Sequence, residues 1–303
     1  MSEQEPWPRG KAALVVGLAA LFFATSGPLA RVAAPAHPLL IAAGRTALAA
    51  AALLLWSPRS TIRALVALPR ATLAKVMGAG LLLAAHFGFF LAGLAETSFA
   101  AAVTLVSLEP VAVVLVAWVA FGARPGRGEL LGVALATAGA LVTAASGAAE
   151  HRLLGDLLVV VAVALYGLYV GAARGLAKAL PPGPYAAAVY GTAAASLSLV
   201  CGALVLGGQE LPLPSHSLLA ILALAVIPTL GGHTLVQWAA RHVPASLVAL
   251  VSPGETVGSL LIGAALLRQP PSAHEGAGAL LVLAGVGCTL VASAGRSGGA
   301  GQG

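Results

Sequence analysis

The stretch that decides the fold occurs twice in the chain. Residues 105–122 read LVSLEPVAVVLVAWVAFG, and residues 250–268 read LVSPGETVGSLLIGAALLR. Each copy places one glutamate, Glu109 or Glu255, inside a long apolar run, and the offset between them is 255 − 109 = 146 residues. A carboxylate is costly inside lipid, so these two positions are the first places to look for a function.

The same offset relates glycines beyond the two stretches. It pairs Gly132 with Gly278 and Gly139 with Gly285. An offset close to half of the 303 residues indicates an internal duplication. Duplicated halves in an apolar sequence are typical of transporters that are built from two structural repeats. We therefore predict three segments, which are a first repeat over 1–150, a second repeat over 151–296, and a disordered Gly/Ser-rich tail over 297–303.

The composition places most of the chain in lipid. Hydrophobic residues make up 59% of the chain and charged residues 9%, whereas a soluble domain has about 45–50% apolar and about 25% charged residues. The formal net charge of +6 does not indicate nucleic acid binding, because the basic residues are spread over short loops without an aromatic-interleaved patch. We expect an integral membrane protein with no nucleic acid partner.

Ten apolar runs are long enough for membrane-spanning helices, which need about 20 residues each. No run alternates with the two-residue period of a barrel strand, so helices are required to satisfy the backbone inside lipid. The predicted spans are 12–32, 37–57, 73–94, 98–121, 128–147, 154–174, 184–206, 217–238, 245–267 and 275–294.

Basic residues in the loops predict the orientation. With the N-terminus inside, three loop residues are external, namely Arg31, Arg152 and Arg268. Twelve are cytoplasmic: Arg9, Lys11, Arg59, Arg63, Arg70, Lys75, Arg124, Arg127, Arg174, Lys178, Arg241 and Arg296. This bias favours cytoplasmic N- and C-termini in the inner or plasma membrane. Five spans per repeat is an odd number, so the predicted fold is all-α, with ten transmembrane helices in two inverted five-helix repeats.

Two motifs in each half resemble the EamA-type repeat of the drug/metabolite transporter superfamily. The first half contains LEPV over 108–111 and LLGVALATAG over 130–139. The second half contains GGHT over 231–234 and GETVG over 254–258. The resemblance extends over nearly the whole chain. It implies a ten-helix inverted-repeat carrier, commonly an exporter of amino acids or other small metabolites.

The chain departs from the family pattern at three positions. The acidic residue that follows the fourth span in the family falls at Ala123, and its counterpart in the second repeat falls at Gln269. The proline after the second-repeat glutamate is replaced by Thr256. The acids at the ends of these loops are therefore absent and carry no role.

Glu109 and Glu255 are the leading candidates for proton coupling, substrate binding or a buried ion pair. An ionised side chain at mid-membrane costs roughly 2.5–3.5 kcal/mol, so it needs a partner or a water-filled cavity. Ser252 and Ser259 share a helical face with Glu255, whereas the face of Glu109 is apolar. We expect Glu255 and Ser259 to face a substrate cavity, and Glu109 to form half of a buried contact.

Arg45 is the one cation well inside a predicted span. Its own helix face is apolar, so the guanidinium must find an acidic or carbonyl partner or extend outward. Two interpretations stay open. Arg45 forms an ion pair with Glu109 or Glu255, or it binds an anionic group of the substrate.

A polar stripe marks the eighth predicted span. Thr229, His233 and Gln237 recur every four residues on an otherwise apolar helix. Residues at this spacing share one helical face, so the stripe favours a substrate-lining surface.

Three further side chains are candidates for the substrate site. His86 lies in the middle of the third predicted span among apolar neighbours, and histidine titrates in a range suited to proton coupling. Tyr166 and Tyr169 share a face of the sixth predicted span. We expect the two tyrosines to line a substrate pocket.

Other classes of chemistry have no motif in the chain. The sequence contains no HExxH metal motif, no phosphate-binding loop and no serine nucleophile motif. Cys201 and Cys288 lie inside apolar runs, so they predict neither a disulfide framework nor a metal site. We expect no enzymatic activity, no cofactor and no metal.

These patterns together predict a secondary transporter that works by alternating access, and the family resemblance implies export of a small amino acid-like or drug-like metabolite. Proton coupling through Glu255, Glu109 or a histidine is one hypothesis, and an uncoupled facilitator or exchanger is the alternative. An intramembrane enzyme and a non-transporting subunit or receptor are further alternatives. The expected partners are a small-molecule substrate, membrane lipid and H+, in a monomer or a homodimer.

Overall fold

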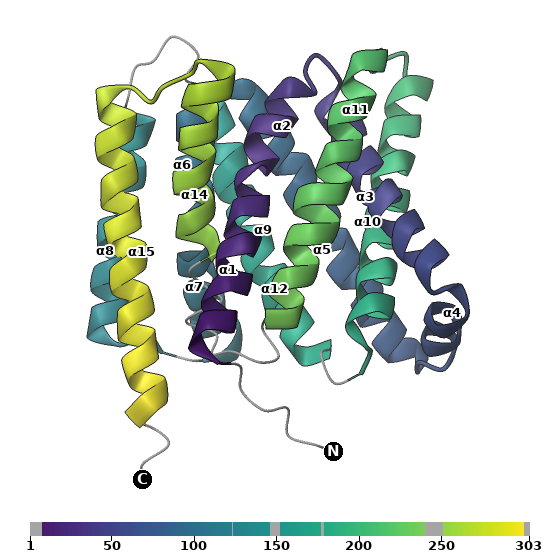
Figure 1. Ribbon diagram of the computed structural model, residues 1–303, viewed down its shortest axis with the longest axis horizontal. Coiled ribbons are helices and arrows are strands. Elements are labelled where there is room, and N and C mark those ends of the chain that lie inside the picture. The colour runs from purple at the N-terminus through teal and green to yellow at the C-terminus, as the bar shows by residue number, and fades with distance from the viewer. Residues whose placement is uncertain (1–7, 123, 146–151, 177–178, 240–250, 300–303) are drawn as a thin grey trace.

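The protein is a bundle of helices that run roughly alongside one another (Figure 1). The computed structural model describes residues 8–122, 124–145, 152–176, 179–239 and 251–299, and these ranges contain no strand. The elements are α1 (Arg9–Ala24), α2 (Ser26–Val32), α3 (Pro38–Trp56), α4 (Pro58–Val66), α5 (Arg70–Glu96), α6 (Phe99–Val106), α7 (Glu109–Phe121), α8 (Arg127–Ala144), α9 (Leu153–Leu176), α10 (Pro182–Leu206), α11 (Ser215–Leu224), η1 (Ala225–Gly232), α12 (His233–Ala239), α14 (Val251–Ile262), η2 (Gly263–Leu267) and α15 (Ala273–Gly299).

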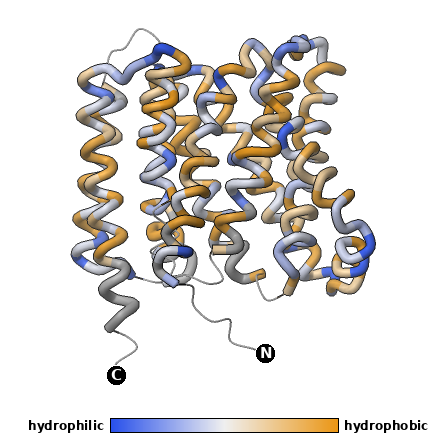
Figure 2. Tube along the Cα trace, in the orientation of Figure 1, coloured by the Kyte–Doolittle hydropathy of each residue, from blue (hydrophilic) through white to orange (hydrophobic). Residues whose placement is uncertain are grey.

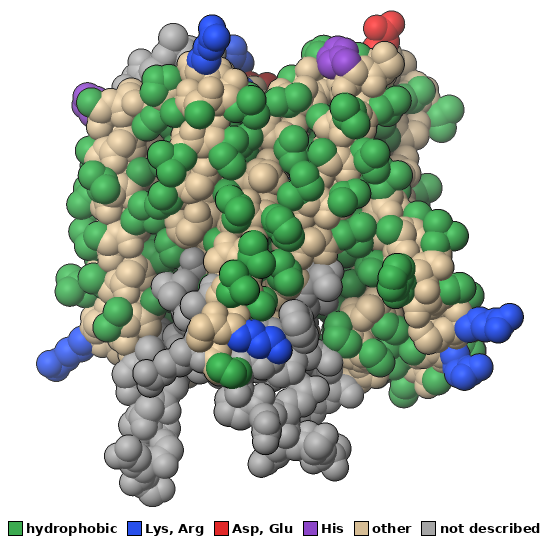
Figure 3. Space-filling view, viewed as in Figure 1, with side chains coloured by type: hydrophobic (Ala, Val, Ile, Leu, Met, Phe, Trp, Pro, Cys, Tyr) green, Lys and Arg blue, Asp and Glu red, His purple; other side chains and the backbone are tan. Residues whose placement is uncertain are grey.

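Eight segments of the described residues are long and apolar enough to cross a membrane. Apolar residues dominate the middle of the trace (Figure 2), and hydrophobic side chains cover the middle of the visible face, with charged side chains at its two ends (Figure 3). The chain is therefore a multi-pass membrane protein. The eight segments are Gly10–Val32, Pro38–Trp56, Arg70–Glu96, Phe99–Val116, Leu153–Ala172, Pro182–Leu206, Ser215–Gly232 and Ala273–Ala292.

The predicted count of ten spans exceeds these eight segments. The apolar stretch Val251–Leu267 is shorter than the others, and the first six residues of the predicted span 245–267 lie outside the described residues. Helix α8 coincides with the predicted fifth span but is not one of the eight segments. The count of ten therefore stays a prediction. Helix α15 continues through the first residues of the predicted tail to Gly299.

Helices α8 and α15 pack closely through glycines of both halves of the chain. A Cβ on Gly132 would lie 2.6 Å from the carbonyl oxygen of Gly285, and a Cβ on Gly139 would lie 2.8 Å from that of Gly278. The reverse contacts have the same lengths, 2.6 Å from Gly285 and 2.8 Å from Gly278. Since the offset of 146 converts each contact into the other, the two antiparallel helices are related by a twofold operation. We call this interface the α8–α15 seam.

The other long helices also pack through small residues. Helix α3 packs against α10, α5 against α9, and α1 against α14. A Cβ on Gly93 of α5 would lie 2.7 Å from the carbonyl oxygen of Gly155 in α9, and a Cβ on Gly258 of α14 would lie 2.6 Å from Cβ of Ala24 in α1. Helices in lipid associate through such close backbone approaches, because no hydrophobic effect drives them together.

Two spans are interrupted near their middles. The first is divided at Thr25, between α1 and α2, and the fourth is divided between α6 and α7. At the first break the hydroxyl of Thr25 donates to the carbonyl oxygen of Phe22 (2.7 Å), and at the second the hydroxyl of Ser107 donates to that of Thr104 (2.6 Å). The two breaks therefore satisfy part of their own backbone. Interrupted helices of this kind often surround the binding sites of transporters.

Pro110 accounts for the break in the fourth span. The sequence predicts one continuous span over 98–121. The structure instead ends α6 at Val106 and begins α7 at Glu109. Pro110 then lies in the first turn of a new helix, where its missing N–H loses no hydrogen bond.

The final helix of each half begins with the same cap. The carboxylate of Glu129 accepts a hydrogen bond from the N–H of Gly126 (2.6 Å), and that of Glu275 accepts one from the N–H of Ser272 (2.8 Å). These residues are also related by the offset, since 129 + 146 = 275 and 126 + 146 = 272. Glu275 additionally accepts a hydrogen bond from the hydroxyl of Ser98, which begins α6. A carboxylate at a helix N-terminus stabilises that helix end.

Candidate functional site

Arg45 lies at the centre of the bundle and is held by neutral groups. Its side chain, in the middle of α3, is only 1% exposed. Its Nε donates to the hydroxyl of Thr229 (3.0 Å), and its Nη1 donates to the hydroxyl of Ser26 (3.3 Å). The guanidinium carbon lies 4.3 Å from the centroid of the Phe87 ring, which gives a cation–π contact. Three other elements of the chain, α2, α5 and η1, therefore hold this one charge.

The two glutamates act on Arg45 only at longer range. Over the residues that the structure describes, neither Glu109 nor Glu255 lies within ion-pair distance of Arg45, so the ion pair suggested by the sequence is not formed here. Glu255 interacts electrostatically with Arg45, and Glu109 interacts with Glu255. Glu109 is buried, whereas Glu255 is half-buried. The guanidinium thus has carboxylates nearby but no directly bonded counter-ion among the described residues.

The surroundings of each glutamate follow from its helix. Glu109 is the first residue of α7, where the positive end of the helix dipole favours a negative charge. Glu255 lies in the second turn of α14. The next residue, Thr256, donates its hydroxyl to the carbonyl oxygen of Val103 in α6 (3.2 Å). The threonine that replaces the family's proline therefore ties α14 to the first half of the chain.

Thr229 contacts Arg45 from a distorted segment of helix. Residues Ala225–Gly232 form the π-helix η1, which contains Pro228. Proline has no N–H to donate and disrupts the regular helical hydrogen-bond pattern. The hydroxyl of Thr229 donates to the carbonyl oxygen of Leu224, five residues earlier (2.7 Å), and accepts from Arg45. Such π-helical segments are frequent at functional sites.

One group of aromatic side chains lies between α5 and α9. The ring of His86 is 5.2 Å from that of Tyr166, centroid to centroid, and the ring of Tyr166 is 6.1 Å from that of Tyr169. Nδ1 of His86 donates to the carbonyl oxygen of Ala162 in α9 (2.8 Å). This bond fixes the tautomer and orientation of the imidazole. Tyr166 also interacts electrostatically with both glutamates.

A second aromatic group surrounds His233. The ring of His233 lies 4.7 Å from that of Phe23, 6.4 Å from that of Phe87 and 6.2 Å from that of Tyr190, all near perpendicular. Because Phe87 also contacts Arg45 and follows His86 in the chain, the two groups form one continuous band. We call this band, together with Arg45, the hydroxyl residues Ser26 and Thr229 and the carboxylates Glu109 and Glu255, the central cluster.

Eight of the ten predicted site residues belong to this cluster, Ser259 does not, and the structure does not describe the side chain of Gln237. The members that the sequence predicted are Arg45, His86, Glu109, Tyr166, Tyr169, Thr229, His233 and Glu255. Ser259 is buried and donates its hydroxyl to the carbonyl oxygen of Ala24 (2.9 Å), so it holds α14 against α1. Gln237 belongs to α12, but its side chain lies outside the described part of the structure.

Four members of the central cluster were missed by the sequence interpretation. They are Phe23, Ser26, Phe87 and Tyr190. Phe87 and Ser26 occur among many similar residues, and their sequence neighbourhood carries no signal. Tyr190 does carry one, because 190 − 146 = 44 and 191 − 146 = 45. The pair Tyr190-Gly191 therefore occupies the positions of Gly44-Arg45 in the other half.

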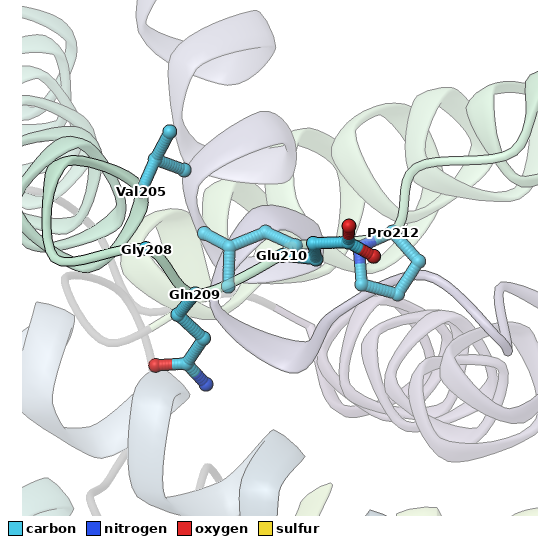
Figure 4. Close-up of a pocket in the computed structure, with 6 residues that line it drawn as sticks. Val205, Gly208, Gln209, Glu210 and Pro212 are labelled. Carbon is cyan, nitrogen blue, oxygen red and sulfur yellow. The ribbon is translucent and has the colours of Figure 1, made fainter.

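Two cavities lie apart from the central cluster. One of about 680 Å³ is lined by Val205 and residues 208–212, where α10 leads to α11 (Figure 4). The other, of about 720 Å³, is an apolar groove between α3, α5, α9 and α10, and its lining includes Leu81, Phe89 and Leu197. Neither cavity is lined by a member of the central cluster, so neither is the candidate site.

Comparisons with known proteins place this geometry in a family. No curated protein matches the chain. Several solved structures match, among them one described as "Crystal structure of protein", with a TM-score of 0.67 and 21% sequence identity, covering 94% of this chain and 99% of that one. At this identity the likeness concerns the fold alone. The model of the EamA-like transporter family matches twice, over residues 10–145 and 153–291, in agreement with the duplication. The chain therefore belongs to the EamA-like transporter family.

Proposed function

We propose that this protein is a secondary transporter that exports a small amino acid-like metabolite by alternating access. Membership of a transporter family supports the general activity. The twofold contacts of the α8–α15 seam support a fold of ten transmembrane helices in two inverted five-helix repeats. Inverted repeats expose a central site to either side of the membrane in turn, by rocking one half against the other.

The observation that carries the proposal is the bonding of Arg45. A buried guanidinium needs an anionic or well-ordered polar partner. Here two hydroxyls and one aromatic ring hold it, while the nearest interacting carboxylates stay beyond ion-pair distance. This arrangement suits a guanidinium that receives the carboxylate of a substrate, because Arg–carboxylate pairs are among the strongest hydrogen-bonded contacts.

The rest of the central cluster fits the other groups of an amino acid. Glu255 is half-buried and close enough to interact with Arg45, so it is placed to bind a substrate ammonium group. The rings of His86, Tyr166 and His233 present flat apolar surfaces beside these charges. Such surfaces favour an apolar or aromatic side group. The class that fits is a zwitterion with a carboxylate, an ammonium group and an apolar side chain.

The interrupted helices supply the moving parts. The breaks at Thr25 and Ser107 flank the central cluster, because Ser26 contacts Arg45 and Glu109 begins the helix after the second break. Each break lets the two segments of one span tilt separately. We propose the N-in, C-in orientation on the basis of the loop charges, with export toward the side of Arg31, Arg152 and Arg268.

The experiment that tests this function is transport by the purified protein in liposomes. Efflux of labelled leucine, phenylalanine and glutamate is measured for the wild type, Arg45→Gln and Arg45→Lys. We expect transport of the apolar amino acids, a loss of roughly a hundredfold for Arg45→Gln, as removal of one buried charged partner costs about 3 kcal/mol, and partial activity for Arg45→Lys. The matched control is Arg268→Gln, an exposed arginine at the end of η2. Full activity of Arg45→Gln would exclude the proposed site.

Coupling is the finer part of the proposal. We propose that Glu255, assisted by Glu109, links transport to H+, with uncoupled facilitated exchange as the alternative. In the same liposomes, the rate is measured with and without a pH gradient for the wild type and Glu255→Gln. Proton coupling requires a gradient-driven rate in the wild type that Glu255→Gln removes. A wild-type rate that ignores the gradient establishes the uncoupled alternative.

A further inference from the structure

Helix α4 is a short helix at one end of the bundle, attached directly to the end of α3 (Figure 1). Ser57 leaves the helical conformation and ends α3, and Pro58 is the first residue of α4. Proline is favourable at the first position of a helix and unfavourable in its interior, so it ends one helix and begins another. The nine residues of α4 are too few to cross a membrane.

The surface of α4 is divided into three sectors. Thr61 is buried, and Ala64 and Leu65 pack against the main core, so this side faces the protein. Ile62 and Val66 are four residues apart and share a second side, which is exposed. Helical residues four apart lie on one face. By the same spacing, the third sector belongs to Arg59 and Arg63.

The apolar sector continues onto the end of α3. Trp56 is 90% exposed, Val66 is 80% exposed and Ile62 is 57% exposed. A group of large apolar side chains this exposed needs a covering that is not water. Tryptophan is enriched where a membrane protein crosses the boundary between acyl chains and headgroups. The exposure and the tryptophan of this sector are those expected at the depth where lipid acyl chains begin.

Among the residues that the structure describes, no acidic side chain pairs with the basic sector. Over the described residues, neither Arg59 nor Arg63 takes part in an ion pair or a hydrogen bond of its side chain. Arg70 and Lys75 in the first turns of α5 add two further exposed positive charges. No Asp or Glu occurs between positions 6 and 95 of the sequence. Figure 3 shows basic side chains gathered over α4.

We propose that α4 and the end of α3 form a binding site for an anionic phospholipid. Arg59 and Arg63 contact the phosphate group, and Trp56, Ile62 and Val66 lie against the upper part of the acyl chains. The order of the sectors matches the order of groups in a lipid, because the basic sector adjoins the apolar sector along one helix. Juxtamembrane basic residues attract anionic lipid by roughly a factor of five each, through their charge.

The test is lipid retention by the full chain. Purified protein is released from micelles in a mass spectrometer after titration with phosphatidylglycerol or phosphatidylcholine, for the wild type, Arg59→Gln/Arg63→Gln and Arg59→Lys/Arg63→Lys. We expect preferential binding of phosphatidylglycerol, a loss of about thirtyfold in the glutamine variant, and retention in the lysine variant. Arg124→Gln/Arg127→Gln is the matched control, with two exposed arginines removed from another loop.

Several outcomes would overturn the proposal. One is equal phosphatidylglycerol binding by the wild type and the Arg59→Gln/Arg63→Gln variant. Another is an equal loss in the Arg124→Gln/Arg127→Gln control, because the effect would then be one of total charge. Displacement of the lipid by millimolar inorganic phosphate or by an acidic peptide would indicate a soluble anion or a protein partner instead.

A second measurement examines the acyl contact directly. Fluorescence quenching by phosphatidylglycerol with brominated chains is compared between the wild type and Trp56→Phe in vesicles. The difference reports Trp56 alone, and we expect it to fall when Arg59 and Arg63 are neutralised. An unchanged difference would separate the apolar sector from the lipid site and contradict the proposal.

Discussion

The α8–α15 seam and the central cluster both derive from the duplicated sequence, but they differ in how far residues at equivalent positions of the two halves are the same. In the seam, glycine is matched with glycine, Gly132 with Gly278 and Gly139 with Gly285, and the carbonyl contacts between these glycines occur in equivalent pairs. In the centre, Glu109 and Glu255 keep the relation, but Arg45 corresponds to Gly191 at the offset of 146. The seam therefore keeps the twofold relation at its glycines, and the centre keeps it only in part.

Several unequal positions of the centre share one pattern. His86 corresponds to Gly232 and Tyr166 to Ala20 at the offset of 146, so a large polar side chain in one half has a small residue as its counterpart in the other. A binding site for one small molecule cannot be filled by two equal sets of large side chains around the same point. In a duplicated transporter, the positions at which the copies differ most in size and charge thus indicate the site.

The largest effect is expected from disturbing the seam. A Cβ at Gly285 would lie 2.4 Å from the backbone nitrogen of Ala136, whereas a Cβ at Gly287 on the same helix meets nothing within 4 Å. Gly285→Leu should therefore lower stability by about 3 kcal/mol through overpacking, and Gly287→Leu should leave it unchanged. Thermal unfolding followed by fluorescence-detected size exclusion measures both. Equal melting temperatures would mean that the seam is not close-packed.

The next effect is expected from removing a partner of Arg45. Thr229→Val deletes the hydroxyl that accepts from Nε, and a buried donor without a partner costs about 1–3 kcal/mol. Transport should fall by about tenfold in the liposome assay. Thr46→Val is the control, because Thr46 is equally buried in the same region but its hydroxyl donates within its own helix, to Ala42. If Thr46→Val reduces transport as much as Thr229→Val does, the loss does not depend on the hydrogen bond to Arg45.

A smaller effect is expected from making one position of the centre equal to its counterpart. Tyr166→Ala gives both halves an alanine and removes the ring beside His86. The substrate concentration for half-maximal transport should rise roughly two- to tenfold, the range that corresponds to one aromatic contact. Tyr166→Phe keeps the ring and should stay near the wild type. If Tyr166→Phe raises this concentration as much as Tyr166→Ala does, the substrate contacts the hydroxyl and not the ring.

The smallest effect is expected at the ends of the bundle. Arg152 and Glu96 form an ion pair of 3.0 Å, but their side chains are 72% and 41% exposed. Exposed pairs of this kind contribute about 0.2–1 kcal/mol, so Arg152→Gln should shift the melting temperature only slightly and leave transport unchanged. A loss comparable to that of Thr229→Val would show that this pair is part of the transport machinery.

The sequence pointed to the glycine pairs of the seam through the offset of 146, although it did not predict the packing of α8 against α15. Glycines that recur at a fixed offset can be recognised without knowing where side chains point. The contacts of Gly132 and Gly139 then follow from the duplication and antiparallel packing. The breaks at Thr25 and Ser107 could not be predicted in the same way. Long apolar runs look continuous in a hydropathy pattern, and Pro110 is compatible with either a bend or a new helix.

The central cluster was predictable in its members but not in its bonding. Arg45, Thr229 and His233 stand out as polar residues in apolar helices. The contact between Arg45 and Thr229 depends on the π-helix around Pro228, which changes the direction of Thr229 relative to a regular helix. Charge alone therefore suggested a glutamate partner, and local backbone geometry supplied a hydroxyl instead.

The seam is also a self-complementary surface contained in one chain. The face of α8 that carries Gly132 and Gly139 fits α15, and α15 carries the same residues at the same spacing. A half-length protein with this face would already match a second copy of itself inserted in the opposite direction. The present interface is therefore the arrangement expected of an ancestral antiparallel homodimer whose two subunits were later fused, after which each copy could change its centre independently.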